Sequence, residues 1–289
     1  MSEEKQRKTA FVFAGGGSFG AIQVGMLHSL ASHGITADMV FGSSVGAINA
    51  AYYAGAPTLE GIRRLEAVWR GLRRQDVFPV NLRTLVGFLR RRDFLVSSDG
   101  LRNLIDTHLP YRNLEDAKIP VHVIATDIIS AETVVLSSGS ACEAILASTA
   151  IPAAFAPVHL RDLFLADGAI SSNTPVRVAV AQGAERLIIL PTGYACARQS
   201  PPVGAVANAL HALTLLIARQ LISELESLAP SIDYYVLPPL CPLGGSPYDF
   251  SQTAELIARA VKSTDEWIDG GGLQVPRVHA QLGLHKHRH

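Results

Sequence analysis

The residue whose setting most clearly indicates chemistry is Ser44. It stands at the centre of a Gly-x-Ser-x-Gly pattern with Gly42 and Gly46, between an apolar run and an alanine-rich run. Such a pattern places a serine on a tight turn from a strand to a helix, where small neighbours avoid a backbone clash and the hydroxyl stays accessible. The dipole of the following helix would stabilise the serine oxygen as it becomes anionic. The pattern predicts a nucleophile; the alternative is a serine that only caps a helix.

A glycine turn precedes this motif. It contains Gly15, Gly16 and Gly17, with Gly20 shortly after. Glycine can adopt positive φ and turn its N–H groups inward, and the helix that follows adds the positive end of its dipole. The turn therefore predicts an anion site. It lacks the Lys-Ser/Thr of a phosphate-binding loop, and its match to the dinucleotide fingerprint, with Asp38 as the acidic residue, is weak.

A serine nucleophile needs a base, and the candidate is Asp167. This residue follows the apolar run "LFLA" and precedes Gly168. We expect it at the carboxyl end of a parallel strand, where open α/β sheets place their sites. The alternative is an aspartate that caps a turn, as Asp-Gly pairs often do. We expect the histidines that could compete for this role to be structural. They are His122, His159, His211 and His279.

In this order and spacing, the three motifs resemble the patatin-like phospholipase family. Supporting matches are "GAINA" after the serine motif, "STAIPAAFAPV" at 148–158 and "SSNTP" after the aspartate, so that the resemblance runs from residue 10 to about residue 182. It implies a Ser–Asp dyad without histidine, with Ser44 as nucleophile and Asp167 as base. It also implies an oxyanion hole made by the amides of Gly15, Gly16 and Gly17. The flanking glycines of the motifs would support the site: Gly20, Gly42, Gly46 and Gly168.

The resemblance implies a lipid acyl hydrolase of the phospholipase A, lysophospholipase or carboxylesterase type, with no cofactor and no metal. It would cleave carboxylic esters through an acyl-enzyme on Ser44. The alternatives are an acyltransferase that uses the same acyl-enzyme and, from a different class, a dinucleotide-binding oxidoreductase. Without an imidazole, the acidic limb of the activity should be set by a carboxylate and not by a group near about 6.5.

One residue departs from the family pattern. Phe19 stands where the family commonly has Arg or Lys, just before the last glycine of the first motif. If that cation holds the glycine loop or a lipid phosphate, its replacement favours neutral or less charged esters.

The apolar runs predict the elements that position these residues. Strands are expected at 9–14, 39–41, 121–128, 133–136, 163–166, 187–190 and 233–237. Helices are expected at 21–32, 45–53 and 176–182, and from a cap at Asp249 to about residue 268. This alternation indicates an α/β fold of three layers, α/β/α, with a central, mainly parallel sheet. We expect a single domain over residues 8–270, between polar tails at 1–7 and 271–289.

The composition agrees with a folded chain and narrows its partners. Hydrophobic residues make up 48% and charged residues 17% of 289 residues, which argues against disorder. Lys+Arg and Asp+Glu number 25 each, so the overall charge does not favour nucleic acid. The three cysteines lie far apart and fit neither a disulfide framework nor a metal site, which favours a reducing compartment.

A basic segment runs from Arg63 to Phe94, with nine arginines against three acids and interleaved aromatic residues. It predicts either a lid that docks on anionic lipid or two amphipathic helices with a solvated arginine face. No apolar run approaches the length of about 18 residues that a membrane span needs, and the polar N-terminus lacks the apolar centre of a secretory signal. We therefore expect a cytoplasmic protein, in the first case with peripheral membrane contact.

Overall fold

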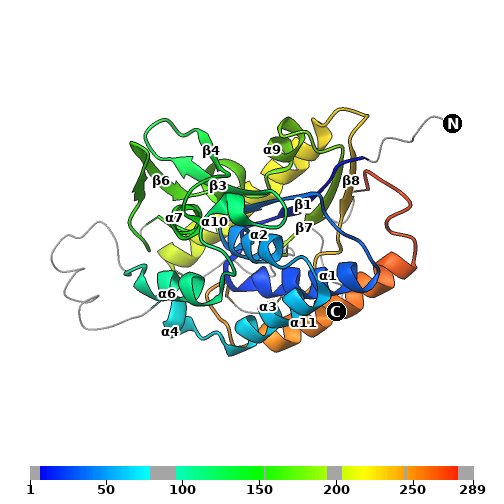
Figure 1. Cartoon of the computed structure of the whole chain (residues 1–289), viewed down its shortest axis with the longest axis horizontal. Coiled ribbons are helices and arrows are strands. Elements are labelled where there is room, and N and C mark those ends of the chain that lie inside the picture. The colour runs from blue at the N-terminus through cyan, green and yellow to red at the C-terminus, as the bar shows by residue number, and fades with distance from the viewer. Residues whose placement is uncertain (1–6, 79–95, 153, 194–203, 244–245, 279–289) are drawn as a thin grey trace.

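The structure is a computed structural model that describes residues 7–78, 96–152, 154–193, 204–243 and 246–278. An eight-stranded sheet lies between two layers of helices (Figure 1). The strands are β1 (Thr9–Phe13), β2 (Met39–Ser43), β3 (Val121–Asp127), β4 (Thr133–Leu136), β5 (Val158–Leu160), β6 (Leu163–Asp167), β7 (Arg186–Leu190) and β8 (Asp233–Val236). The predicted α/β fold with a mainly parallel sheet is confirmed, because β3, β2, β1, β7 and β8 pair in parallel in that order.

Helices cover both faces of this sheet. They are α1 (Gly20–Ser32), α2 (Val45–Gly55), α3 (Leu59–Gly71), α4 (Arg74–Val77), α6 (Asp99–His108), α7 (Ala141–Ser148), α8 (Ala169–Ser172), α9 (Val176–Ala181), α10 (Ala205–Glu226) and α11 (Thr253–Asp269). Side chains alternate along β1: Phe11 and Phe13 enter the core that includes α1 and α2, whereas Ala10 and Val12 enter the core that includes α9 and α10. Strands buried on both faces explain the continuous apolar runs of the sequence.

The strand that ends at Asp167 differs from the prediction. β6 runs antiparallel to β3, with Ala125 opposite Asp167. β4 also pairs with β3, through residues 123–126, and so takes one edge of that strand. β2 pairs with residues 121–124 of β3 and β6 with residues 125–127, so both must use the other edge. β2 and β6 therefore lie end to end along β3, and their carboxyl ends meet between Ile124 and Ala125.

Two local predictions are wrong. The last helix begins at Thr253 and not at a cap on Asp249, whose carboxylate instead accepts the N–H of Ser251 at 2.9 Å. The cysteines are not all unpaired either: Cys241 is disulfide-bonded, while Cys142 is free and buried. Within the described ranges, no helix has the length and apolar character that a membrane span requires.

Candidate active site

Ser44 lies on a sharp turn between β2 and α2, with φ of 54° and ψ of −128°. Positive φ is strained for a residue with a side chain, and such strain is typical of functional turns. The two glycines of the motif make the turn sterically feasible. A Cβ at Gly42 would lie 2.3 Å from the carbonyl oxygen of Gly46, and a Cβ at Gly46 would lie 2.4 Å from that of Phe13. The elbow expected from the sequence is thus present.

A buried hydroxyl anchors the elbow. Ser148, the last residue of α7, accepts the N–H of Ser44 at 2.9 Å and donates to the carbonyl of Ile124. Ser148 is fully buried, so this bridge cannot be replaced by bulk water. It fixes the strained turn against β3 at the point where β2 stops pairing.

Asp167 is hydrogen-bonded to Ser44. The Ser44 hydroxyl donates to Oδ2 of Asp167 at 2.7 Å, and the other carboxylate oxygen accepts the N–H of Ala169 at 2.8 Å. Asp167 is 4% exposed. Burial raises the pKa of its carboxyl from 3.8 to about 6, against the opposing effect of these two hydrogen bonds. A carboxylate with this pKa is a stronger base than an ordinary aspartate and is still ionised at neutral pH.

The glycine turn packs directly against this pair. A Cβ at Gly15 would lie 3.1 Å from Cβ of Ser44 and 2.5 Å from Oδ1 of Asn173. The N–H of Gly15 donates to the carbonyl of Asn173 at 3.1 Å, so it is not free to bind an oxyanion, contrary to the prediction. Within the described part of the chain, the N–H groups of Gly16 and Gly17 have no acceptor.

Distant residues that sequence reasoning missed hold the turn in place. Thr192 donates its hydroxyl to the carbonyl of Gly15 at 2.7 Å, and Ser18 donates its N–H to the carbonyl of Pro247 at 2.7 Å. Gly17 has φ of +60°, and a Cβ there would lie 2.3 Å from the same Pro247 oxygen. No local pattern signals these contacts, because they join segments that are far apart in the chain. Phe19 packs against the core, so an apolar side chain stands where the family commonly has a cation.

A buried polar network ties the turn to the helices around it. Gln23 donates to the carbonyls of Ala14 at 2.8 Å and Leu190 at 2.9 Å, and its side-chain oxygen accepts from Asn49 at 2.8 Å. The indole N–H of Trp69 donates to Asn49 at 2.9 Å. Every one of these polar groups has a partner, as buried polar groups require. The network therefore fixes α1, α2 and α3 relative to one another.

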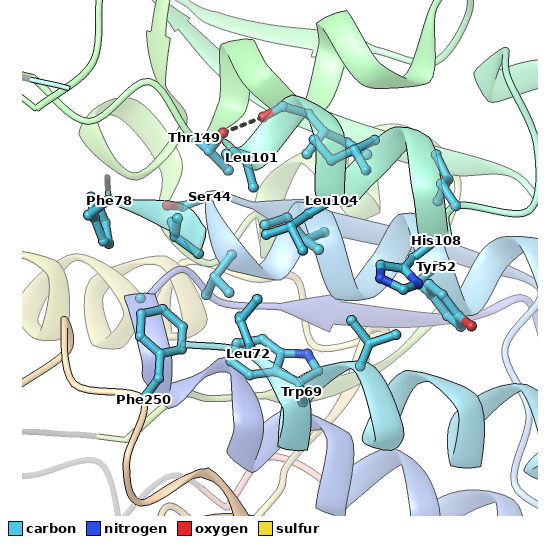
Figure 2. Close-up of a pocket in the computed structure, with 18 of the residues that line it drawn as sticks. Ser44, Tyr52, Trp69, Leu72, Phe78, Leu101, Leu104, His108, Thr149 and Phe250 are labelled. Atoms are coloured by element: carbon cyan, nitrogen blue, oxygen red, sulfur yellow. Dashed lines mark hydrogen bonds between the residues drawn. The ribbon is translucent and has the colours of Figure 1, made fainter. Parts of the chain in front are cut away.

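An apolar cavity opens beside Ser44 (Figure 2). Its empty volume is about 890 Å³, part of which is open to solvent. Helices α2, α3 and α6 each contribute at least three residues to its lining, which consists of Gly17, Ser44, Val45, Ile48, Tyr52, Leu65, Val68, Trp69, Leu72, Val77, Phe78, Leu101, Leu104, Ile105, His108, Leu109, Ile145, Thr149, Ile151, Phe155 and Phe250. Among the described residues of this lining there is no Asp, Glu, Lys or Arg, so the cavity suits an apolar ligand.

Aromatic rings border the cavity. Phe78 stacks on Phe155 with centroids 5.5 Å apart and meets Tyr248 edge-on at 5.6 Å, while Trp69 stacks on Phe250 at 6.2 Å. Phe78 belongs to the basic segment from Arg63 to Phe94. The part of that segment after residue 78 lies outside the described residues.

Two of the described histidines stack on aromatic rings. His122 stacks on Phe41 at 4.4 Å, and burial lowers its pKa. His159 lies against Phe164 at 4.9 Å. Neither forms a hydrogen bond with Ser44 or Asp167. The side chain of His211 and the whole of His279 lie outside the described residues. In the described ranges, no group of three His, Cys, Asp or Glu residues is arranged to hold a metal ion.

A strand-to-helix elbow that presents a serine at the edge of an α/β sheet is typical of serine ester hydrolases. The comparison with known families is more specific. Residues 11–180, more than half of the chain, match the model "Patatin-like phospholipase". The chain therefore belongs to the patatin-like phospholipase family.

Curated relatives agree with this assignment. The chain is 29% identical over 190 residues to "Patatin-like phospholipase domain-containing protein 7" of Rattus norvegicus, covering 64% of this chain and 13% of the relative. It is 30% identical over 178 residues to "Uncharacterized NTE family protein MT2641" of Mycobacterium tuberculosis, covering 61% and 28%. It is 25% identical over 192 residues to "Lysophospholipase NTE1" of Scheffersomyces stipitis, covering 64% and 12%. The chain thus matches less than a third of the length of each of these relatives.

A solved structure supports the fold. The crystal structure of VipD from Legionella pneumophila superimposes with a TM-score of 0.50 at 16% sequence identity, covering 93% of this chain and 67% of that one. At this identity the likeness concerns the fold alone.

Proposed function

We propose that this chain is a lipid acyl hydrolase that cleaves carboxylic esters through an acyl-enzyme on Ser44, with Asp167 as the base. The observation that carries the proposal is the 2.7 Å hydrogen bond from Ser44 to Asp167, beside an apolar cavity that Ser44 lines. The family match and the names of the relatives support the same class of reaction.

In the first half-reaction, Ser44 attacks the acyl carbonyl carbon while Asp167 takes the hydroxyl proton. The carbonyl oxygen becomes an oxyanion, and we assign its stabilisation to the N–H groups of Gly16 and Gly17, which have no acceptor in the described chain. Collapse of this intermediate breaks the bond to the alcohol, which leaves with the proton from Asp167. In the second half-reaction, Asp167 takes a proton from water, the hydroxide attacks the acyl-enzyme, and Ser44 recovers its proton.

The test is labelling with a fluorophosphonate probe, followed by mapping of the adduct. Labelling and ester hydrolysis should both depend on Ser44 and be lost in Ser44→Ala. Ser43 and Ser18 are the other serines of the two motifs, with exposed fractions of 0% and 1% against 7% for Ser44. Ser43→Ala is therefore the matched control and should still be labelled. An adduct on Ser43 or Ser18 would refute the assignment.

Two alternatives remain distinguishable. An acyltransferase would pass the same acyl group to an alcohol or thiol acceptor, so product analysis with and without such an acceptor separates it from a hydrolase. A dinucleotide-binding oxidoreductase would leave the hydrogen bond between Ser44 and Asp167 without a role.

Phe19, which stands in place of the family cation, favours neutral or less charged esters. A panel of lipids with different headgroups tests this preference.

Peripheral membrane contact through the segment from Arg63 to Phe94 also stays a proposal. On its described part, Arg64 and Arg70 are exposed, but each pairs with a glutamate of α3, at 3.6 Å and 2.8 Å. Such pairs reduce the charge that is available to anionic lipid. Sedimentation with anionic and neutral vesicles at low and high salt tests the idea. Replacing Arg90, Arg91 and Arg92 by Glu should weaken the anionic interaction alone.

A further inference from the structure

The cavity beside Ser44 follows one face of α2. Three residues of α2 line it, Val45, Ile48 and Tyr52, at spacings of three and four that place them on one face of the helix. At a rise of about 1.5 Å per residue, Val45 and Tyr52 are roughly 10 Å apart along the axis. The cavity therefore follows this face of α2 for two turns, and we call it the channel.

Helix α6 forms a second wall with the same periodicity. Leu101, Leu104 and His108 line the cavity at spacings of three and four. Figure 2 shows Ser44 and Leu101 toward one end, Leu104 in the middle, and His108 with Tyr52 at the opposite end. Successive turns of α6 thus lie at increasing distance from the nucleophile.

The two ends of the channel differ in exposure. Ser44 is buried at one end, whereas His108, the last residue of α6, is exposed at the other. Among the lining residues that the structure describes, His108 is the one side chain that can carry a positive charge. The channel therefore leads from the hydroxyl of Ser44 between apolar helices to the protein surface.

We propose that this channel holds the acyl chain of the substrate, with its methyl end beside His108, and that α6 acts as a ruler for acyl length. The proposal rests on the proposed function, because it needs the ester carbonyl at Ser44. A straight, unbranched chain fits between two helices that run alongside it. A charged or strongly polar acyl group would lose its hydration without gaining a partner.

Turnover of a homologous ester series tests the ruler. Each methylene that enters the channel should raise kcat/KM by up to about fourfold, until the chain reaches His108. Para-nitrophenyl butyrate, octanoate, laurate and palmitate share one leaving group and differ in acyl length alone. In His108→Trp, the ratio of kcat/KM for palmitate to that for butyrate should fall at least tenfold. Leu104 lies one turn nearer to Ser44. In Leu104→Trp, the drop in kcat/KM should therefore begin at a shorter acyl chain than in His108→Trp.

The matched control is Thr107→Trp. Thr107 is exposed, precedes His108 on the same helix and does not line the cavity. The same bulky side chain at this position should leave the length profile as in the wild type. The proposal is refuted if the dependence of kcat/KM on acyl length is unchanged in both His108→Trp and Leu104→Trp. It is also refuted if Thr107→Trp changes that dependence as much as these two variants do.

A second measurement separates the channel from catalysis. The chain has two tryptophans, and Trp69 lines the channel whereas Trp267 does not. In a Ser44→Ala, Trp267→Phe variant, a fluorescent polyene fatty acid should quench Trp69 by energy transfer, although no turnover occurs. Failure of the wild type to hydrolyse any ester, with quenching retained, would refute the proposed function but keep the channel. Absence of quenching would refute the acyl channel itself.

Discussion

Ser44 and Asp167 are 123 residues apart in the sequence, yet their side chains are 2.7 Å apart because the strands that precede them end at the same point on β3. β2 stops pairing at Ile124 and β6 at Ala125, from opposite directions along one edge. Gly168 permits this meeting, since a Cβ there would lie 2.2 Å from the carbonyl oxygen of Ile124. The pairing of the two strands with β3 therefore places Ser44 and Asp167 next to each other.

Replacing the base Asp167 by Asn should abolish activity and raise the free energy of unfolding. Asp167→Asn should be nearly inactive, because an amide cannot accept the proton of Ser44. The ionised carboxylate is costly in the folded state: raising its pKa from 3.8 to about 6 corresponds to roughly 3 kcal/mol at neutral pH. The carboxyl of Asp167 binds its proton more tightly in the folded state than in the unfolded state. The loss of stability is therefore complete above the folded-state pKa of about 6, and it disappears as the pH falls below the unfolded-state pKa of 3.8. Denaturant unfolding should thus show Asp167→Asn to be more stable than the wild type at alkaline pH, with a gap that closes in acid. A less stable variant at alkaline pH would contradict the calculation.

The acidic limb of the activity should lie near pH 6. Asp167 must be ionised to act as a base, so kcat/KM should fall tenfold per pH unit below its pKa of about 6. This pKa is close to that of an ordinary histidine, so the position of the limb does not distinguish a dyad from a triad, contrary to the expectation from the sequence. The measurement therefore needs variants. In His108→Gln and His122→Phe, the limb should stay near pH 6, whereas its loss in either variant would identify an imidazole base.

Two neighbouring buried serines should respond in opposite ways. Ser148→Ala leaves the N–H of Ser44 and the carbonyl of Ile124 without a partner, which should cost about 1–3 kcal/mol of unfolding free energy. It should also lower kcat, because the strained elbow loses its anchor. Ser43→Ala removes a buried hydroxyl that has no partner in the described structure, so stability should be unchanged or slightly higher. Chemical unfolding with parallel kinetics checks both, and equal effects of the two variants would refute the anchoring role.

Thr192 should matter for turnover more than for binding. Its hydroxyl holds the carbonyl of Gly15, and so sets the orientation of the glycine turn. Loss of one oxyanion donor costs about 10²–10³ in kcat, so a displaced turn in Thr192→Ala should cost at least about tenfold. KM for a short ester should change little. Thr192→Ser keeps the hydroxyl and should restore most of kcat. Direct substitution of Gly16 is a less clean test, because a Cβ there would lie 2.2 Å from Oγ1 of Thr192.

Local patterns predicted the strand-to-helix elbow at Ser44 well. The spacing of Gly42, Ser44 and Gly46 is enough to predict the elbow. A Cβ at Gly42 would clash with the backbone of the turn, and a Cβ at Gly46 would clash with the backbone of β1. The apolar runs likewise predicted most strands to within a residue or two. These features depend on neighbours in the sequence.

The parts that could not be predicted depend on contacts between distant segments. The direction of β6 is set by its pairing with β3, and the amide of Gly15 is occupied by a carbonyl of Asn173. The channel is formed where faces of α2, α3 and α6 meet, and no one of these helices reveals it alone. The extent of the single domain, residues 8–270, stays a prediction.

The contact between Ser18 and Pro247 bears on how this protein could be shortened or recombined. Pro247 lies well beyond residue 180, where the family match ends, and so do Thr192 and β7, the strand that pairs with β1. A fragment cut at the edge of the match would keep Ser44 and Asp167 but lose the supports of the glycine turn and one neighbour of the central strand. Grafts between relatives should therefore carry the residues after 180 together with the motifs, because the glycine turn depends on contacts that lie outside the family match.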